Sequence, residues 1–375
     1  MKETSLRELA QLFLKLGTVA FGGPAAHIAM MQDEVVDRRE WFSRQRFLDL
    51  VGATNLIPGP NSTELAIHIG YERAGWAGLL VAGSSFILPA MLIVTGFAWA
   101  YVEYGSTPTG EALLYGVQPV VIAIVAHALA KLAPTAARDW LLRGIVVAAV
   151  ALFLSGVNEL LILFGLGLLV MLVQVTERFG FGVSHMFFPL PVIVLVQDAG
   201  SPVSLERLFL AFLKIGAVLY GGGYVILAFL QNDFVERLGW LTQQQLIDAV
   251  SVGQVTPGPV FTTATFIGYV LMGVPGALVA TLGIFLPSFF FVAITHRYIE
   301  RMRSSPWFSG LLDGVNAAAV GLMGGVTVQL SREAIVDVPT IVVALAALIL
   351  LVATRINSAW LILAGGAIGL AVDLL

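Results

Sequence analysis

The chain has 375 residues, of which 58% are hydrophobic, 39 are glycine and only 12% are charged. Soluble domains carry about 25% charged residues, so a soluble fold of this size could not cover so much apolar surface. The mean hydropathy of +0.90 agrees with this reasoning. The composition therefore predicts an all-α polytopic membrane protein.

Several functional classes are excluded by the same counts. A net charge of −4 without a basic run excludes nucleic acid as a partner. The absence of cysteine excludes disulfides, thiol catalysis and cysteine-bound metals. The five histidines have no metal-ligand spacing. We therefore expect no catalytic residues, no metal site and no cofactor. The charged N-terminal stretch without a cleavage motif is interpreted as mature sequence.

Apolar windows of about 20 residues predict six hydrophobic segments in each half of the chain. In the first half they cover residues 9–31, 47–70, 75–101, 111–130, 141–157 and 158–175. In the second half they cover residues 208–230, 246–269, 273–295, 310–330, 338–353 and 358–375. A short apolar stretch with two prolines, 183–197, lies between the halves.

The second half repeats the first. FLKLGTVAFGG, which begins at Phe13, returns as FLKIGAVLYGG from Phe212, an offset of 199 residues, and 18 of the 48 positions from 13 to 60 are identical. After a gap of one residue the match continues at an offset of 198. We therefore predict an N-terminal repeat, 1–176, and a C-terminal repeat, 204–375, joined by a linker, 177–203, that contains the short hydrophobic segment.

Loop charges predict that the two repeats have opposite orientation. The loop after the first segment holds four arginines in the N-terminal repeat and only Arg237 in the C-terminal repeat. Because positive loops lie on the cytoplasmic side, we expect inverted-topology repeats with residues 183–197 as the thirteenth crossing. The loop before segment two is positive and the loop after segment three is neutral, so one of these two segments does not cross the membrane. The Pro58-Gly59-Pro60 break favours segment two as a re-entrant segment. The first segment, broken at Gly22-Gly23, is open to the same interpretation.

Inverted repeats with interrupted helices are typical of secondary transporters, which bind substrate at the repeat interface. A helix that restarts after a break offers free N–H groups and a positive dipole end to an anion. Glycine also lets the backbone approach a ligand closely. We therefore expect substrate-binding backbone at Gly22, Gly23, Pro58, Gly59 and Pro60, and at Gly221, Gly222, Gly223, Pro257, Gly258 and Pro259 in the second copy. Tight packing and kinks are the alternative explanation.

Charged and polar side chains near these breaks are the other candidates. Lys15 and Lys214 occupy the same repeat position, and two ammonium groups related by pseudo-symmetry could converge on one dianion. Snorkelling to the membrane surface is the alternative for both lysines. Further candidates for substrate binding are the matched polar residues Asn55, Thr63, Gln254, Thr262 and Thr263.

Glu64 is the candidate for proton coupling, because it is a carboxyl group beside the expected anion site, and its repeat counterpart is Thr263. The alternative is structural: Asn61 would cap the restarting helix and Glu64 would complete a capping box. Asp49 and Asp248 follow expected helix caps, so we expect both at the membrane interface. We expect His27 and His68 to be packing residues without a functional role. We expect His127, near Lys131, to lie at the membrane edge.

The two sequence stretches with the glycine and proline breaks resemble a known family. FLKLGTVAFGGPAAHIAMMQDEVV with WFSRQRFLDLVGATNLIPGPNSTELAIHIGY looks like the signature half of the chromate ion transporter family, and GQVTPGPVFTTATFIGY looks like its second half. The resemblance covers essentially the whole chain and matches the long, two-domain form. It implies chromate efflux across the bacterial cytoplasmic membrane, giving chromate resistance and driven by the proton gradient or by anion exchange. The second copy departs from the first at Gly223 and Thr263, which replace a proline and a glutamate.

Other functions stay open at this point. Sulfate or another tetrahedral oxyanion is the main alternative substrate, because its size and charge barely differ from those of chromate. An intramembrane enzyme is disfavoured because the sequence has no GxSxG or HExxH motif. A cation channel would need carboxylate rings rather than matched lysines. The expected partners are the substrate anion and the lipid bilayer, and a homodimer is compatible with the sequence.

Overall fold

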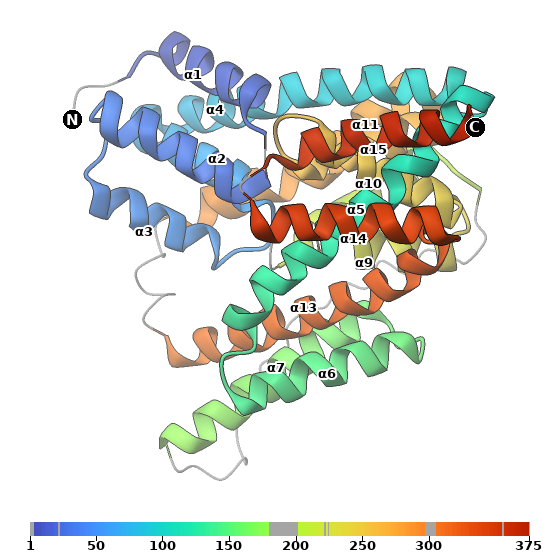
Figure 1. Cartoon of the computed structure of the whole chain (residues 1–375). Coiled ribbons are helices and arrows are strands. Elements are labelled where there is room, and N and C mark those ends of the chain that lie inside the picture. The colour runs from blue at the N-terminus through green and yellow to red at the C-terminus, as the bar shows by residue number, and fades with distance from the viewer. Residues whose placement is uncertain are drawn as a thin grey trace.

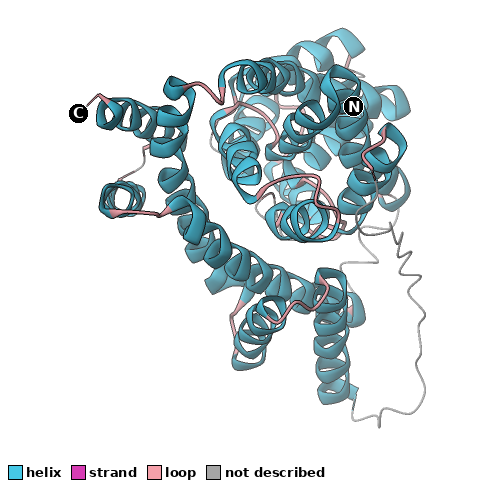
Figure 2. Cartoon of the chain, turned by 90° about the vertical axis from the view of Figure 1, so that its right-hand side faces the viewer, coloured by secondary structure: helices cyan, strands magenta, loops and turns pink. Residues whose placement is uncertain are grey.

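The computed structural model describes residues 4–21, 23–179, 202–220, 223, 225–296, 305–354 and 356–374. Within these ranges the regular structure is helical, with 14 α-helices, two π-helical turns and one short 3-10 helix (Figures 1 and 2). The predicted segment at 183–197 lies outside the described residues, so the thirteenth crossing stays a prediction.

The N-terminal repeat begins with short helices and continues with longer ones. Its elements are α1 (Leu6–Val19), α2 (Gly23–Gln32), the π-turn η1 (Asp33–Arg38), α3 (Arg44–Thr54), α4 (Asn61–Tyr104), α5 (Pro108–Ala136), α6 (Trp140–Leu154) and α7 (Glu159–Phe179). Helix boundaries follow local chemistry. The Ser43 hydroxyl accepts the N–H of Arg46 at the start of α3, and Thr107 followed by Pro108 begins α5.

The C-terminal repeat follows the same order. Its elements are α8 (Leu205–Val218), α9 (Ile226–Leu230), η2 (Gln231–Arg237), α10 (Gln243–Val255), the 3-10 turn η3 (Val260–Thr262), α11 (Thr263–Thr295), α13 (Pro306–Ala334), α14 (Val338–Ala353) and α15 (Ser358–Asp373). A capping box between Thr242 and Gln245 begins α10. The first two predicted segments of each repeat are thus not continuous helices: each is split where the sequence has its glycine or proline break.

In the N-terminal repeat the two halves of each split segment fold back on one another. Lys15 of α1 lies 2.6 Å from Glu34, whereas the earlier Glu8 lies 2.8 Å from the later Arg39. An earlier residue of α1 therefore contacts a later residue of the second half, and a later residue of α1 contacts an earlier one. This pattern shows that α1 runs antiparallel to α2 and η1. Helix α3 pairs with the start of α4 in the same way. Arg46 forms an ion pair with Glu72, and Asn61 Nδ2 donates to Asn55 Oδ1 at 2.8 Å.

The proline and glycine residues explain the second of these reversals. Proline lacks a backbone N–H and disfavours helix in the residue before it, so Pro58 and Pro60 end one helix and begin another. Gly59 and its counterpart Gly258 have φ angles of 140° and 87°, which favour glycine. The chain reverses at both positions.

Helices α4 and α11 each contain a further reversal. At Gly75 and at Gly273 the φ angles are 59° and 62°, and the helix is interrupted. A methyl group on Gly70 would overlap the carbonyl oxygen of Gly78, and the equivalent Gly268 and Gly276 are equally close. Residues eight apart in a continuous helix would be about 12 Å apart. Each of these helices is therefore an antiparallel hairpin.

Four helices in the described part of the chain are long and apolar enough to cross a membrane: Asn61–Tyr104, Pro108–Ala136, Val260–Thr295 and Trp307–Ala334. Four shorter apolar helices accompany them: Trp140–Leu154, Glu159–Gln174, Val338–Ala353 and Ser358–Asp373. This confirms the expectation of an all-helical protein with several long apolar spans.

The long second arms of α4 and α11 run in opposite directions. His296, just past the C-terminal end of α11, lies 3.2 Å from Glu72, near the reversal of α4. At the other end, Tyr101 near the C-terminus of α4 donates a 2.9 Å hydrogen bond to Asp248 of α10. Reciprocal bonds join the breaks themselves. The N–H of Gly59 donates to the carbonyl of Leu219, and the N–H of Gly258 donates to the carbonyl of Ala20.

The last two helices of each repeat pack on the other repeat. Helices α6 and α7 lie against α13, whereas α14 and α15 lie against α5 (Figure 1). Small residues permit both contacts, because Gly116 meets Gly365 and the equivalent Gly314 meets Gly167, in each case backbone to backbone. Each repeat therefore places its last two helices against the other repeat, and one hydrophobic core includes residues of both.

Candidate functional site

A cavity of about 880 Å³ lies where the interrupted ends of the two repeats meet. Phe21 and Pro24 flank the glycine break of the first repeat, and their equivalents Tyr220 and Gly223 line the same space. The other lining residues are Ala25, Ala26, Thr54, Asn55, Ile57, Asn61, Ile124, His127, Ala128, Lys131, Leu132, Thr135, Ala136, Asn316, Val320, Leu351, Thr354, Ile356, Asn357 and Ser358. We call this space the break cavity.

The break cavity suits an anion. Its described lining includes His127 and Lys131, one turn apart on α5, and contains no aspartate or glutamate. The first residues of α2, α4 and α15 also line it, so three helix N-termini add partial positive charge, while the ends of α3, α5 and α14 at the same wall add partial negative charge. The amides of Asn55, Asn61 and Asn316 supply hydrogen-bond donors. A hydrated dianion would meet positive charge and donors on several sides.

The structure distributes the predicted backbone residues among three places. Asn55 and Gly223 line the break cavity, and Gly23 begins α2 beside it. Gly59 and Gly258, with their flanking prolines Pro58, Pro60, Pro257 and Pro259, lie at the reciprocal bonds between repeats instead. Gly22, Gly221 and Gly222 lie outside the described residues.

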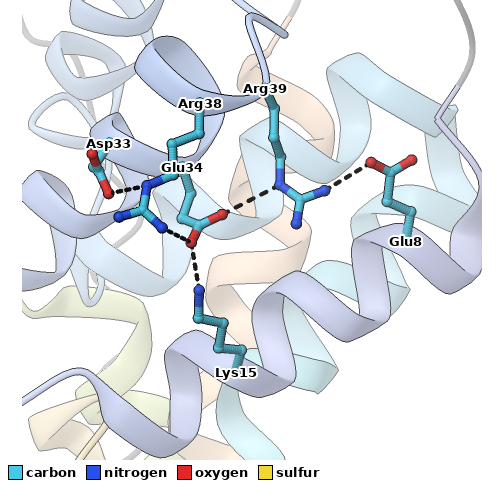
Figure 3. Close-up of polar contacts among 6 residues, drawn as sticks. All are labelled: Glu8, Lys15, Asp33, Glu34, Arg38 and Arg39. Atoms are coloured by element: carbon cyan, nitrogen blue, oxygen red, sulfur yellow. Dashed lines mark hydrogen bonds and ion pairs between the residues drawn. The ribbon is translucent and has the colours of Figure 1, made fainter.

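Lys15 takes part in a network of ion pairs (Figure 3). Its ammonium lies 2.6 Å from Glu34, which also contacts Arg39 at 3.3 Å and Arg38 at 3.6 Å. The hydrogen bond from Lys15 is the largest cause that lowers the pKa of Glu34. The lysine side chain is 54% exposed. Its charge is already matched by a carboxylate of its own repeat.

Lys214 has the equivalent partner in the C-terminal repeat, but its network is buried. Its ammonium lies 2.7 Å from Asp233, the counterpart of Glu34, and 3.4 Å from Glu159 of α7. Arg237 lies 2.7 Å from the same aspartate. The two lysines thus lie in separate ion pairs, and neither lines the break cavity. The idea that both ammonium groups converge on one dianion does not fit this arrangement.

Glu64 is fully buried, and both of its carboxyl oxygens lack a hydrogen-bond partner. The capping-box alternative is wrong, because Pro60 occupies the N-cap of α4 and no side chain caps it. The carboxyl lies beside Gly59 and Ser288, whose hydroxyl is also unpartnered. It acts electrostatically on Tyr220, which lines the break cavity. A buried polar group without a protein partner is a functional candidate.

The predicted hydroxyl groups differ between the repeats. Thr63 Oγ1 is buried without a partner, whereas Thr262 and Thr263 donate to the carbonyls of Pro259 and Val260. Gln254 is buried. The N-terminal copy therefore keeps a hydroxyl free for water or ligand, and the two half-sites are not equivalent.

Asp248 is not at an exposed interface, contrary to the sequence expectation. It is 1% exposed and accepts hydrogen bonds from Tyr101 and Gln118 of the other repeat, each at 2.9 Å. It lines a second cavity of about 690 Å³ near the N-terminal part of α5. Crossing contacts with the other repeat, which no local pattern reveals, bury this residue.

Sequence reasoning missed several residues of the break cavity. His127 and Lys131 were placed at the membrane edge, and Asn61, Tyr220 and Asn316 were not considered as lining residues. One signal was available: Asn316 is the repeat counterpart of Gln118, so a polar amide recurs at one position of α5 and α13. His127 and Lys131 have no such repeat signal.

Interrupted helices in two interlocked copies, in a chain of this composition, define a multi-pass helical membrane protein. A model of the chromate transporter family matches residues 7–171 and 206–370. The "Probable chromate transport protein" of Synechococcus elongatus is 35% identical over 92% of this chain and 89% of its own length. The "Chromate transport protein" of Cupriavidus metallidurans is 34% identical, over 97% and 92%. No solved structure matches the chain significantly.

The chain belongs to the chromate transporter family, and two copies of the family domain occupy it. This confirms the resemblance drawn from the sequence, including the long two-domain form. The family is one of transporters, which implies that the protein is not an enzyme.

Proposed function

We propose that this protein transports chromate out of the cell across the bacterial cytoplasmic membrane and thereby confers chromate resistance. It acts as a secondary transporter, driven by the proton gradient or by anion exchange. The family and relatives named as chromate transport proteins support the substrate. The break cavity carries the proposal, since it combines the ammonium group of Lys131, the imidazole of His127, helix N-termini and amide donors.

The transported dianion binds in the break cavity. Transferring a bare divalent anion into low dielectric costs tens of kcal/mol, so the site has to replace its hydration shell. Lys131, His127 and the N–H groups at Gly23 and Asn61 are the groups that do so. The reversals at Pro58–Pro60 and Pro257–Pro259 hold these helix ends in place, and the paired Lys15 and Lys214 fix the hairpins that carry them.

The two repeats lie in the membrane with inverted topology, and the split segments are re-entrant. The antiparallel arms of α4 and α11 support this topology, as do the ion pairs that link the two halves of three split segments: Lys15–Glu34, Arg46–Glu72 and Lys214–Asp233. Irregular backbone at membrane depth requires protein or water around it, and the break cavity provides such surroundings. Rocking of one repeat against the other would expose the cavity to alternate sides.

Glu64 carries the coupling proton. Its carboxyl is buried without a partner and interacts electrostatically with Tyr220 of the cavity wall. A protonated carboxyl would be neutral when the dianion is bound nearby, and an ionised one would repel the anion. Proton binding and anion binding are thereby positively linked, so one proton leaves with the dianion, and the membrane potential, negative inside, drives the remaining net negative charge outward.

Sulfate is the second candidate substrate. It has the charge and tetrahedral shape of chromate, and a cavity of about 880 Å³ is much larger than either anion. The lining of the break cavity therefore selects for the charge of the anion more than for its size.

Uptake of labelled chromate and sulfate into everted membrane vesicles tests the proposal. We expect uptake of chromate that increases when the vesicles are energised, and a KM at least tenfold higher in Lys131→Gln. Arg143→Gln, which removes a cation outside the cavity at the start of α6, should leave the KM unchanged. Equal uptake by vesicles without the protein would overturn the proposal.

A further inference from the structure

We propose that His68, His296 and Glu72 form a proton relay that connects one end of the protein to Glu64. The proposal rests on the proposed role of Glu64 as proton carrier. It assigns the path by which a proton reaches or leaves that carboxyl, from residues that the anion site does not use.

The relay follows one face of a helix. Glu64, His68 and Glu72 are spaced four residues apart in the first arm of α4, so their side chains lie on the same face, one turn above another. The face ends at the reversal of the chain near Gly75. His296, which follows α11 in the other repeat, packs against this end.

The distances form a chain of contacts. His68 Nδ1 lies 3.3 Å from His296 Nδ1, and His296 Nε2 lies 3.2 Å from Glu72 Oε1. Arg46 of α3 forms an ion pair with the same glutamate. The outer groups of the relay are partly exposed, 10% for the side chain of Glu72 and 16% for that of His296, whereas His68 and Glu64 are 0% exposed. Protons from water therefore have a start point and a buried end point.

The hydrogen positions permit transfer one proton at a time. When His296 donates Nε2–H to Glu72, its Nδ1 is an acceptor, and His68 donates Nδ1–H to it. A proton that leaves Glu64 binds His68 Nε2. The Nδ1 proton of His68 then passes to His296 Nδ1, and His296 releases its Nε2 proton to Glu72 and water. One proton enters and one leaves, and both imidazoles end neutral in the other tautomer.

The inner end of the relay has free polar atoms. His68 Nε2 and both oxygens of Glu64 are buried without a hydrogen-bond partner, and Ser288 Oγ and Thr63 Oγ1 are in the same condition. Side chains four residues apart on a helix can be bridged by one water molecule, and buried polar atoms of this kind are where proteins hold water. This step connects the imidazole to the carboxyl.

Among the residues that the structure describes, the charged and titratable groups that act on His68 are His296 from the end of α11, Glu72 from its own helix and Arg46 from α3. The ring of Tyr71 lies 4.6 Å from that of His296. Arg73, next in the chain, is directed elsewhere, to Thr4 and the carbonyl of Trp41.

The second repeat is an internal control for packing. At the pseudo-symmetric corner, the positions equivalent to His68, Glu72 and His296 hold Phe266 and Val270 of the second repeat and Ala98 of the first, and the phenylalanine and alanine are buried. The three equivalent positions themselves therefore have no titratable side chain, although Tyr101 and Asp248 lie nearby. The imidazoles at the first corner are an addition that packing does not require.

The test compares proton-driven with proton-independent transport in everted vesicles. The double variant H68F/H296A places the residues of the pseudo-symmetric corner, Phe266 and Ala98, at both positions, which favours a normal fold. We expect a loss of at least tenfold in chromate uptake driven by a pH gradient. Exchange of labelled for unlabelled chromate, which needs no net proton movement, should change less than twofold. His68→Gln, which keeps a polar side chain but cannot relay a proton, should behave in the same way.

Thr265→Val is the matched control, because Thr265 is buried beside Phe266 at the equivalent corner and should retain gradient-driven uptake. Retention of gradient-driven uptake by both relay variants would overturn the relay while Glu64 remains the carrier. Absence of any response to the pH gradient in the unmodified protein would instead overturn the proposed proton coupling, and the relay with it.

Discussion

Replacing each repeat-equivalent lysine by methionine should have very different effects on stability. Lys214→Met removes the ammonium but keeps the length of the side chain. It leaves Asp233 and Glu159, both 0% exposed, with the guanidinium of Arg237 as the remaining cation. Removing one partner of a buried ion pair costs about 3–5 kcal/mol, because an uncompensated buried charge remains.

The equivalent change Lys15→Met acts on a side chain that is 54% exposed. Glu34 keeps contacts with Arg38 and Arg39, and exposed ion pairs contribute about 0–1 kcal/mol. At about 2 °C per kcal/mol for a large domain, the melting temperature should fall by about 6–10 °C in Lys214→Met and by about 2 °C or less in Lys15→Met.

Thermal unfolding of the purified proteins in one detergent, followed by tryptophan fluorescence, measures both shifts. Equal shifts in the two variants would refute the argument from burial. A fully stable Lys15→Met protein that no longer takes up chromate would show that this lysine contacts the substrate after all.

Three further outcomes are expected. Gly70→Leu should destabilise the protein by about 1–3 kcal/mol or prevent folding, because the side chain would overlap Gly78, whereas Gly144→Ala, with nothing within 4 Å, should be neutral or stabilising in the same thermal assay. Glu64→Gln should remove the response of chromate uptake to a pH gradient and retain chromate exchange, and an unchanged response would exclude the carboxyl as proton carrier. The lowered pKa of Glu34 means that its ionised form stabilises the folded state above its ordinary value of about 4.5, and this contribution is lost as the pH falls through the lower folded value. The stability difference between the unmodified protein and Glu34→Gln, measured from pH 7 to pH 3, should therefore shrink, and a constant difference would contradict this.

The sequence was sufficient for features that recur at a fixed offset. Glycine and proline have few uses inside an apolar helix, so the matched Pro58-Gly59-Pro60 and Pro257-Gly258-Pro259 breaks predicted interruptions that the structure contains. The inner reversals at Gly75 and Gly273 coincide with the first residues of the third predicted segments. Apolar windows show where segments separate but not that the two arms pack on each other.

Contacts between distant parts of the chain were not predictable. Lys15 and Lys214 were identified by identity between the copies, but their partners differ, Glu34 in one and Asp233 in the other, and this difference hid the ion pair. Asp248 was assigned to the membrane interface because it follows an expected helix cap, whereas Tyr101 and Gln118 of the other repeat bury it. Such contacts depend on how the two repeats pack together. The hydrophobic periodicity of a single segment does not predict this packing.

Equilibrium binding of radiolabelled chromate to the purified protein tests the break cavity most directly. Asn316→Asp changes few atoms but adds a negative charge to the cavity wall. At an effective dielectric constant of about 40, a unit charge about 8 Å from a dianion costs about 2 kcal/mol. We predict that chromate affinity falls at least tenfold, while Gln243→Glu, the same charge change in the first turn of α10, leaves it within twofold. Unchanged affinity in Asn316→Asp would contradict the assignment of the cavity as the anion site.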